Sequence, residues 1–221
     1  MMNIGESPAE SKNGLVTSLA WKHGGKVSYV MEGNVNYSAA VITWLKDSLG
    51  LVASPGETEA LARSAHPQDT TYLVPAFSGL GMPHWNSEAK ALICGMTRLT
   101  GKAELARAAL DCIAYQICDV ISAMEKDTGI RIPVLRVDGG ASRNGYLMQF
   151  QSDMLDALVA RAEAEELSGT GTAYMAGMRA GLYTDAVFET LRYTEYRPAI
   201  ADNARKRLLD GWRAAVGMLR K

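Results

Sequence analysis

The chain has 221 residues, with 23 lysine and arginine residues against 24 aspartate and glutamate residues, which gives a net charge of −1. This balance argues against nucleic acid as the main partner, because nucleic-acid-binding domains carry a clear basic excess. Hydrophobic residues make up 48% and charged residues 21%, a composition typical of folded globular domains and not of disordered chains.

Other classes of protein are excluded by the apolar runs and the cysteines. No run approaches the roughly 20 apolar residues of a membrane-spanning helix, and residues 1–13 lack the basic start and apolar stretch of a signal peptide. Cys94, Cys112 and Cys118 form no CxxC pair and are odd in number, so neither a disulfide framework nor a zinc site is expected. We therefore expect a cytoplasmic protein that has no membrane partner.

A β-hairpin is predicted near the start of the chain. Two β-rich runs, 15–21 and 26–32, are separated by Lys-His-Gly-Gly at 22–25, and glycine supplies the positive φ that a tight turn needs. Residues 1–4 open without a cap or a turn. We expect that the chain begins partway along an element and that the first strand of its sheet is absent.

Helices and strands alternate after the hairpin. The predicted elements are, in chain order, helices 37–49 and 57–65, strands 72–74 and 91–97, a long helix from about 100 to 127, strand 134–137, helix 143–155, strand 158–160, and helices 172–180 and 203–219. This alternation favours an α/β domain with a mixed sheet flanked by helices. No linker divides the chain into two domains.

The segment 134–144 carries the strongest local signal for a ligand. A buried-type strand runs into Gly139 and Gly140, and a helix begins near Asn144. Paired glycines let a ligand approach the backbone without meeting a Cβ atom, and Asn144 could hydrogen-bond a base or a ribose. The alternative is an ordinary strand–turn–helix corner in which the asparagine only caps the helix.

Two other segments have both a functional and a structural interpretation. Residues 168–172, Ser-Gly-Thr-Gly-Thr, open a helix with a small-residue face, which suits either close contact with phosphate or tight helix packing. The Gly, Pro and aromatic residues of 77–85 indicate a packed loop, at a cleft or over a sheet edge, and His84 within it is expected to be packed or exposed. Glu163, Glu165 and Glu166 suggest a solvated acidic loop.

Six segments also match one known family, in the same order along the chain. They are YLVPAFSGLGMPHW (72–85), ALICGM (91–96), ELARAALD (104–111), LRVDGG (135–140), YLMQFQSD (146–153) and GTAYMAG (171–177). On these segments the chain resembles the FGGY carbohydrate kinases, and most closely their glycerol-kinase branch. The resemblance runs over nearly the whole chain, from about Met2 to Trp212.

The resemblance implies a two-lobed, actin-like (ribonuclease H-like) ATPase fold, of which residues 1–221 form the C-terminal lobe and the N-terminal lobe is absent. It implies ATP and Mg²⁺ as cofactors, with the metal ligands outside this chain, and a polyol or sugar substrate shared with the other lobe. The implied reaction is phosphoryl transfer from ATP to an alcohol group. A lobe separated from its partner exposes an apolar face, so self-association into a homo-oligomer is also expected.

The family's nucleotide contacts carry over to five positions. The adenosine motif falls on Gly139, Gly140 and Asn144, and the helix after the hairpin places Ala39 and Thr43 where the glycerol-kinase branch has Gly and Gln. The family's catalytic Asp and its phosphate-binding and substrate-binding residues precede residue 1, so no catalytic residue and no metal ligand is assigned. The alternatives are a non-catalytic actin-like nucleotide-binding module and an inactive truncated fragment.

Overall fold

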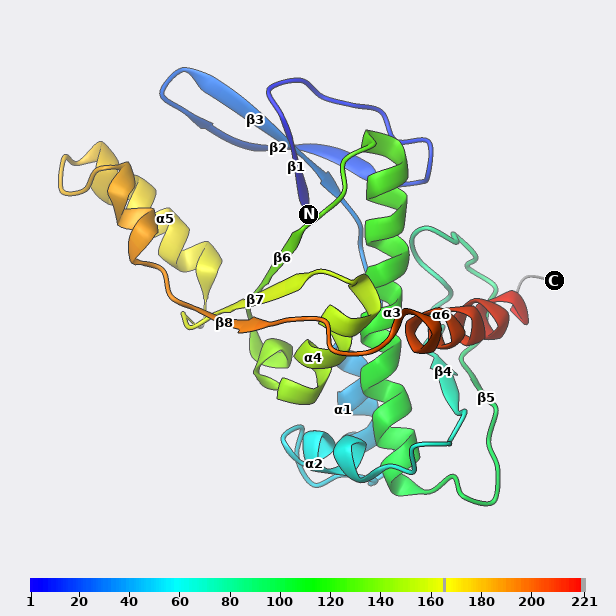
Figure 1. The fold of residues 1–221 in the computed structure, drawn as a ribbon. Helices are drawn as coiled ribbons and strands as arrows, with labels where there is room; N and C mark the ends of the chain where they lie inside the picture. Colours follow the sequence, from blue (N-terminus) through cyan, green and yellow to red (C-terminus); the bar gives the residue numbers. More distant parts are fainter. Residues whose placement is uncertain (165, 220–221) are drawn as a thin grey trace. The chain divides into compact units, whose positions relative to one another are not determined.

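The computed structural model describes residues 1–164 and 166–219 (Figure 1). The chain forms two compact units. Unit 1 comprises residues 1–132 and 201–221, and unit 2 comprises residues 133–200. The expectation that residues 1–221 form a single lobe stays a prediction.

Unit 1 begins with a three-stranded antiparallel sheet. Its strands β1 (Met2–Gly5), β2 (Val16–His23) and β3 (Lys26–Glu32) lie in the order β1-β3-β2. The predicted hairpin is confirmed, with Gly24 and Gly25 in the turn at φ 57° and 82°. The opening residues, for which no complete element was predicted, form β1.

The rest of unit 1 is built around one long helix, α3, which spans 27 residues. The other elements are α1 (Ala40–Asp47), α2 (Glu57–Ser64), β4 (Tyr72–Val74), β5 (Leu92–Cys94), α3 (Lys102–Thr128) and α6 (Asp202–Gly217). Gly101 precedes α3, and Gly129, at φ 69°, ends it in the left-handed conformation that favours glycine. The predicted long helix is therefore confirmed at both ends.

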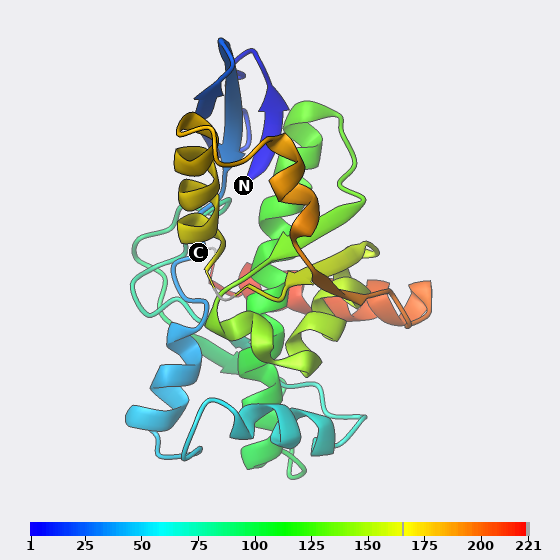
Figure 2. The ribbon, with the colours of Figure 1, turned by 90° about the vertical axis from the view of Figure 1, so that its left-hand side faces the viewer.

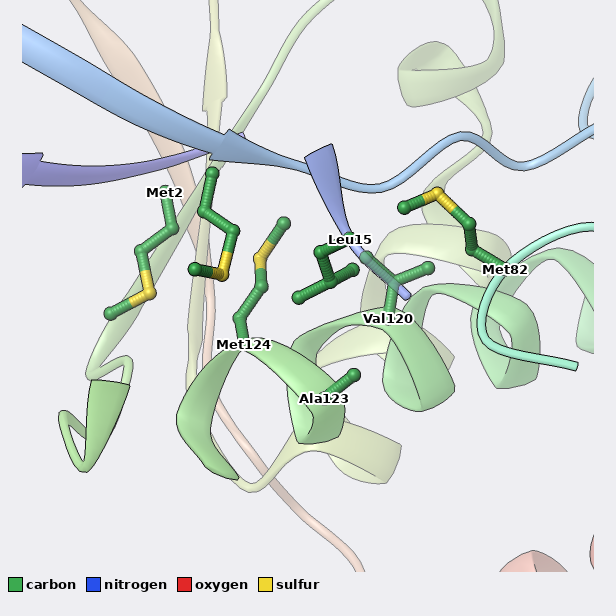
Figure 3. Packing of buried hydrophobic residues seen from close by; sticks show 7 residues of the cluster. Met2, Leu15, Met82, Val120, Ala123 and Met124 are labelled. Atoms are coloured by element: carbon green, nitrogen blue, oxygen red, sulfur yellow. The ribbon is translucent and has the colours of Figure 1, made fainter. Parts of the chain in front are cut away.

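A methionine-rich cluster joins the first sheet to α3 (Figure 3). Its members are Met2, Leu15, Met31, Met82, Val120, Ala123 and Met124. Unbranched methionine side chains fill irregular gaps between elements of different geometry. Close approach of the backbone to α3 also requires Gly33, because a Cβ atom there would lie 2.1 Å from Cγ1 of Val120.

Aromatic packing fixes α6 against α3. The rings of Tyr115 and Trp212 stack with centroids 5.2 Å apart, and the hydroxyl of Tyr72 donates to the carbonyl of Leu208 at 3.2 Å. Gly211 leaves room for the Tyr72 side chain, since a Cβ atom there would lie 2.1 Å from its hydroxyl oxygen.

The loop that contains 77–85 is anchored by polar contacts. His84 Nε2 lies 3.2 Å from Oδ2 of Asp119 on α3, and the indole N–H of Trp212 donates to the same oxygen at 2.8 Å. The indole N–H of Trp85 donates to the carbonyl of Gly14 at 3.1 Å. The loop is thus packed, and His84 has the packed role, one of the two that the sequence left open.

Unit 2 contains the mixed sheet. Its elements are β6 (Val134–Val137), the 3₁₀ helix η1 (Gly140–Arg143), α4 (Gly145–Leu155), β7 (Leu158–Ala162), α5 (Leu167–Arg179), the 3₁₀ helix η2 (Asp185–Thr190) and β8 (Tyr193–Tyr196). Strand β7 lies in the middle, parallel to β6 and antiparallel to β8. The expected mixed sheet is therefore found in this unit, with α4 packed against β7 and β8.

The predicted helix at 172–180 is wrong at its start. Helix α5 begins at Leu167, so residues 168–172, which are expected to open the helix, lie within its first turns. Glu166 caps the helix, because its carboxylate accepts a hydrogen bond from the N–H of Ser168 at 3.1 Å. Glu166 is thus a helix cap, and it is exposed, as is Glu163, which agrees with the solvated acidic loop that the sequence predicts; Glu165 lies outside the described residues.

Helix α5 pairs with η2 as a helical hairpin (Figure 2). Tyr174 makes edge-on ring contacts with Tyr183 and Phe188, at centroid distances of 6.0 and 5.8 Å. Gly177 faces Tyr183 at a position where a Cβ atom would clash. In the part of the chain that the structure describes, no helix is long and apolar enough to cross a membrane.

Glu104 anchors the start of α3, and replacing it tests the role of that helix in unit 1. Its side chain is buried, and its carboxylate accepts hydrogen bonds from the backbone N–H groups of His66 and Gly101, each at 2.8 Å. The bond from His66 lowers the pKa of Glu104, and the bond from Gly101 adds to this effect against the opposing influence of burial. The ionised carboxylate therefore stabilises the fold.

We expect Glu104→Gln to lower the free energy of unfolding at neutral pH by about 1–2 kcal/mol, since one buried donor loses its acceptor. Because the folded-state pKa is lowered, this stabilisation is present above the ordinary glutamate value of 4.5 and is lost as pH falls through the folded-state value. Urea unfolding followed by circular dichroism at several pH values measures it, with exposed Glu10→Gln as the control. A deficit that stays constant down to acid pH would contradict this account.

Candidate functional site

The predicted glycine turn is a tightly specified piece of backbone. Strand β6 ends at Val137, and Gly139 follows at φ 81° and ψ 175°, a region that is essentially restricted to glycine. The backbone N–H of Ser142 donates to the carbonyl of Gly139 at 3.2 Å, and its hydroxyl donates to the same oxygen at 2.7 Å. These bonds close the turn that leads into η1.

Asn144 caps α4. Its Oδ1 atom accepts a hydrogen bond from the N–H of Leu147 at 3.0 Å, and its own backbone is extended. The capping interpretation of Asn144 is therefore confirmed. A contact from Asn144 to a base or ribose stays a prediction.

A hollow of about 400 Å³ opens beside the glycine turn. Its lining residues are Gly139, Ser142, Arg143, Arg161, Ala162, Glu163 and Ala164. Strands β6 and β7 run parallel, so their carboxyl ends meet at one edge of the sheet, the place where α/β sheets bind ligands. The volume lies within the range of pockets for small molecules and cofactors.

The backbone beside this hollow is free of side-chain atoms. A Cβ atom built on Gly139 or on Gly140 would meet no other protein atom within 4 Å. The absence of a side chain at Gly140 is therefore not required by packing within the described part of the protein. It leaves space in which a ligand can approach the backbone.

Charged side chains on the hollow come from both of its walls. Arg143 belongs to η1, whereas Arg161 and Glu163 lie at the end of β7. The guanidinium group of Arg161 is held by a cross-strand hydrogen bond from Nη2 to Oγ1 of Thr194 at 3.1 Å. A guanidinium group fixed in this way is suited to binding phosphate or to stacking on a flat ring.

The two loops at the rim are tied together by Asp138. Its Oδ2 atom accepts a hydrogen bond from the N–H of Leu167, the first residue of α5, at 3.2 Å. The sequence interpretation included Asp138 in the glycine segment but missed Arg161 and Glu163 as parts of this region. These residues come together only because β6 pairs with β7. The only signal in the sequence that could have indicated this position is a strand followed directly by polar residues.

Ala39 and Thr43 lie in unit 1, at the start of α1. Both residues are exposed, and the carbonyl of Ala39 accepts the N–H of Thr43 at 3.2 Å, so the two lie one helical turn apart on the same face. Their nucleotide contacts stay predictions. Among the residues that the structure describes, no group of three or more His, Cys, Asp or Glu side chains is placed to hold a metal ion.

Comparison with known proteins assigns the family. Residues 1–180 match the FGGY family of carbohydrate kinases, C-terminal domain. The chain belongs to this family. Glycerol kinase from Paraburkholderia phytofirmans is 47% identical to it over 219 residues, and glycerol kinase from Burkholderia pseudomallei is 48% identical over the same number. Each alignment covers 98% of this chain but 44% of the relative, so the chain spans less than half the length of those proteins.

Solved structures agree with the family. Glycerol kinase from Plasmodium falciparum, crystallised with ADP, superposes with a TM-score of 0.91 at 30% identity over 98% of this chain and 44% of that one. A ligand-bound xylulose kinase from Lactobacillus acidophilus gives a TM-score of 0.79 at 18% identity over 97% of this chain and 43% of that one, and so supports the fold alone. The expected α/β, actin-like fold of the FGGY kinases is confirmed.

Alanine substitutions in the glycine turn should show which glycine is required by its backbone conformation and which only leaves space for a ligand. Gly139→Ala forces a side chain into a glycine-only conformation and should cost about 1–3 kcal/mol of stability. Asn144→Ala removes the cap of α4 and should cost about 1 kcal/mol. Gly140→Ala meets no neighbouring atom and should stay within about 0.5 kcal/mol of wild type.

Urea unfolding of the three variants measures these differences. A Gly140→Ala variant as unstable as Gly139→Ala would show that the turn, and not ligand access, demands both glycines.

Proposed function

We propose that this chain provides the nucleotide-binding part of an ATP-dependent carbohydrate kinase that transfers a phosphoryl group to an alcohol group of a polyol or sugar. The adenosine of ATP or ADP lies against the Gly139–Gly140 backbone beside the hollow. The observation that carries the proposal is the open space next to Gly140 at the carboxyl ends of two parallel strands. Family membership and the ADP named for the Plasmodium falciparum enzyme support it.

The residues around the hollow can bind a nucleotide and orient it. Kinases act chiefly by positioning donor and acceptor and by neutralising phosphate charge. The glycine turn fits a nucleotide because it offers backbone without side chains, and Arg143 and Arg161 bring positive charge to the same hollow. Mg²⁺ would neutralise phosphate charge when bound. We place its ligands, the catalytic base and the acceptor pocket in an N-terminal lobe outside this chain, in a cytoplasmic enzyme.

A second candidate function is a nucleotide-binding module without catalysis. Ala39 adds a methyl group where the glycerol-kinase branch has Gly, and Thr43 has a shorter hydrogen-bonding side chain than Gln. Both residues are exposed on one face of α1, where such changes would weaken a contact with nucleotide. DNA sequence upstream of Met1 separates the candidates: an in-frame extension with a catalytic aspartate supports the kinase, and a genuine start at Met1 supports the module.

Side chains of increasing size at position 140 should progressively weaken ADP binding. We expect Gly140→Ala to weaken binding by about two- to tenfold, the equivalent of one lost hydrogen bond. Gly140→Val should weaken binding more than Gly140→Ala does, and more than Asn144→Ala does. Calorimetric titration of the 221-residue chain with ADP measures the series.

The matched control is Gly217→Val, because a Cβ atom there also meets no atom within 4 Å and the residue lies at the end of α6. If wild type binds no ADP, or if Gly140→Val binds ADP as wild type does, the adenosine assignment is wrong and the strand–turn–helix interpretation stands.

The chain alone should not phosphorylate an acceptor. Because the family's catalytic base matches no position in residues 1–221, we expect no glycerol-dependent or pentose-dependent release of ADP from ATP. A coupled ADP-release assay tests this expectation. Substrate-dependent turnover in the range of about 1–100 s⁻¹, usual for kinases, would show that this chain contains a base that the resemblance does not identify.

A further inference from the structure

The hollow beside the glycine turn contains a carboxylate to which the nucleotide contacts above give no role. Glu163 lies on its wall, directly after β7, and its side chain is exposed. Its backbone is fixed, since its N–H donates to the carbonyl of Arg192 at 3.0 Å. Glu163 therefore places a hydrogen-bond acceptor at the candidate site from a backbone position that the sheet fixes.

The position of Glu163 in the topology is informative. Strand β6, the glycine turn, helix α4 and strand β7 form a β-α-β unit with parallel strands, and Val137 pairs with Arg161 at its carboxyl edge. Gly139 and Glu163 each follow that pair by two residues. The glycine turn and the carboxylate therefore follow the carboxyl ends of two neighbouring strands, and both line the same hollow.

The same placement has a known chemical use in unrelated dinucleotide-binding folds. There a glycine turn after the first strand receives phosphate, and an acidic residue roughly 20 positions further on accepts a hydrogen bond from a ribose hydroxyl. The glycine spacing here is different, so the similarity lies in the position of the acid. A carboxylate has two acceptor oxygens, which match the two vicinal hydroxyl groups of a ribose.

The surrounding charges suit a ribonucleotide. Arg143 and Arg161 line the hollow together with Glu163, and Arg161 is held by Thr194. Positive charge at the hollow is favourable for a ligand that carries phosphate.

We propose that Glu163 accepts hydrogen bonds from the ribose hydroxyls of the bound nucleotide and thereby selects ribonucleotides over deoxyribonucleotides. This inference rests on the proposed function, because it assigns one part of the same nucleotide to one further residue. Hydrogen bonds to a charged group are stronger than those between neutral groups, so their removal gives a measurable loss of affinity.

The test is a set of calorimetric titrations of the 221-residue chain with ADP, 2′-deoxy-ADP and 3′-deoxy-ADP. Wild type should bind at least one deoxynucleotide about tenfold or more weakly than it binds ADP. Glu163→Ala should bind ADP weakly and should bind all three ligands within about twofold of one another. Glu189→Ala, an exposed change of the same kind on η2, should keep the wild-type preference. Far-UV circular dichroism checks that both variants are folded.

The outcomes separate this inference from the proposed function. Suppose that wild type binds ADP and that Gly140→Val weakens this binding, but that Glu163→Ala still prefers ADP to the deoxynucleotides. The ribose assignment is then wrong, while the adenosine site stands. Equal binding of all three nucleotides by wild type also overturns the ribose assignment. If wild type binds no nucleotide, the proposed function and this inference both fall.

Discussion

The parallel pairing of β6 with β7 is the constraint on which the candidate site depends. Because the two strands run in the same direction, the turn after each of them lies at the same edge of the sheet. Helix α4 makes the return between them, and Ser152 fixes that helix, with its hydroxyl oxygen 2.8 Å from the carbonyl oxygen of Ala157 and 3.0 Å from that of Tyr196. A slip of one residue in the pairing would carry Arg161 and Glu163 to the opposite face of the sheet.

Local sequence signals were sufficient for the elements that carry them. The hairpin turn, the long helix α3 and the strand before Gly139 are each marked by glycine or by apolar spacing, and the structure has all three. The same holds for Asn144, because an asparagine before a helical stretch is a common cap. The family resemblance, carried by short segments spread over the chain, was confirmed as well.

Features that depend on distant partners could not be predicted in this way. Strand β8 has the sequence Tyr-Thr-Glu-Tyr and carries no apolar run, so its existence depends on β7 as an antiparallel partner. Helix α5 starts early because Glu166 caps it and Asp138, from another loop, accepts the N–H of Leu167. Glu163 lies in the exposed acidic segment that the sequence predicts, but nothing near it in sequence indicates the hollow.

Under the proposed function, the candidate nucleotide contacts in the two units are groups of different kinds. In unit 2 they are a glycine backbone and the carboxylate of Glu163 directly after β7, whereas in unit 1 they are the side chains of Ala39 and Thr43 on α1. A backbone contact survives most substitutions around it, but a side-chain contact is lost with a single change of residue. Departure from the family pattern at Ala39 and Thr43, together with retention of Gly139 and Gly140, is therefore compatible with continued binding. In that case recognition would depend chiefly on the glycine turn and on the ribose.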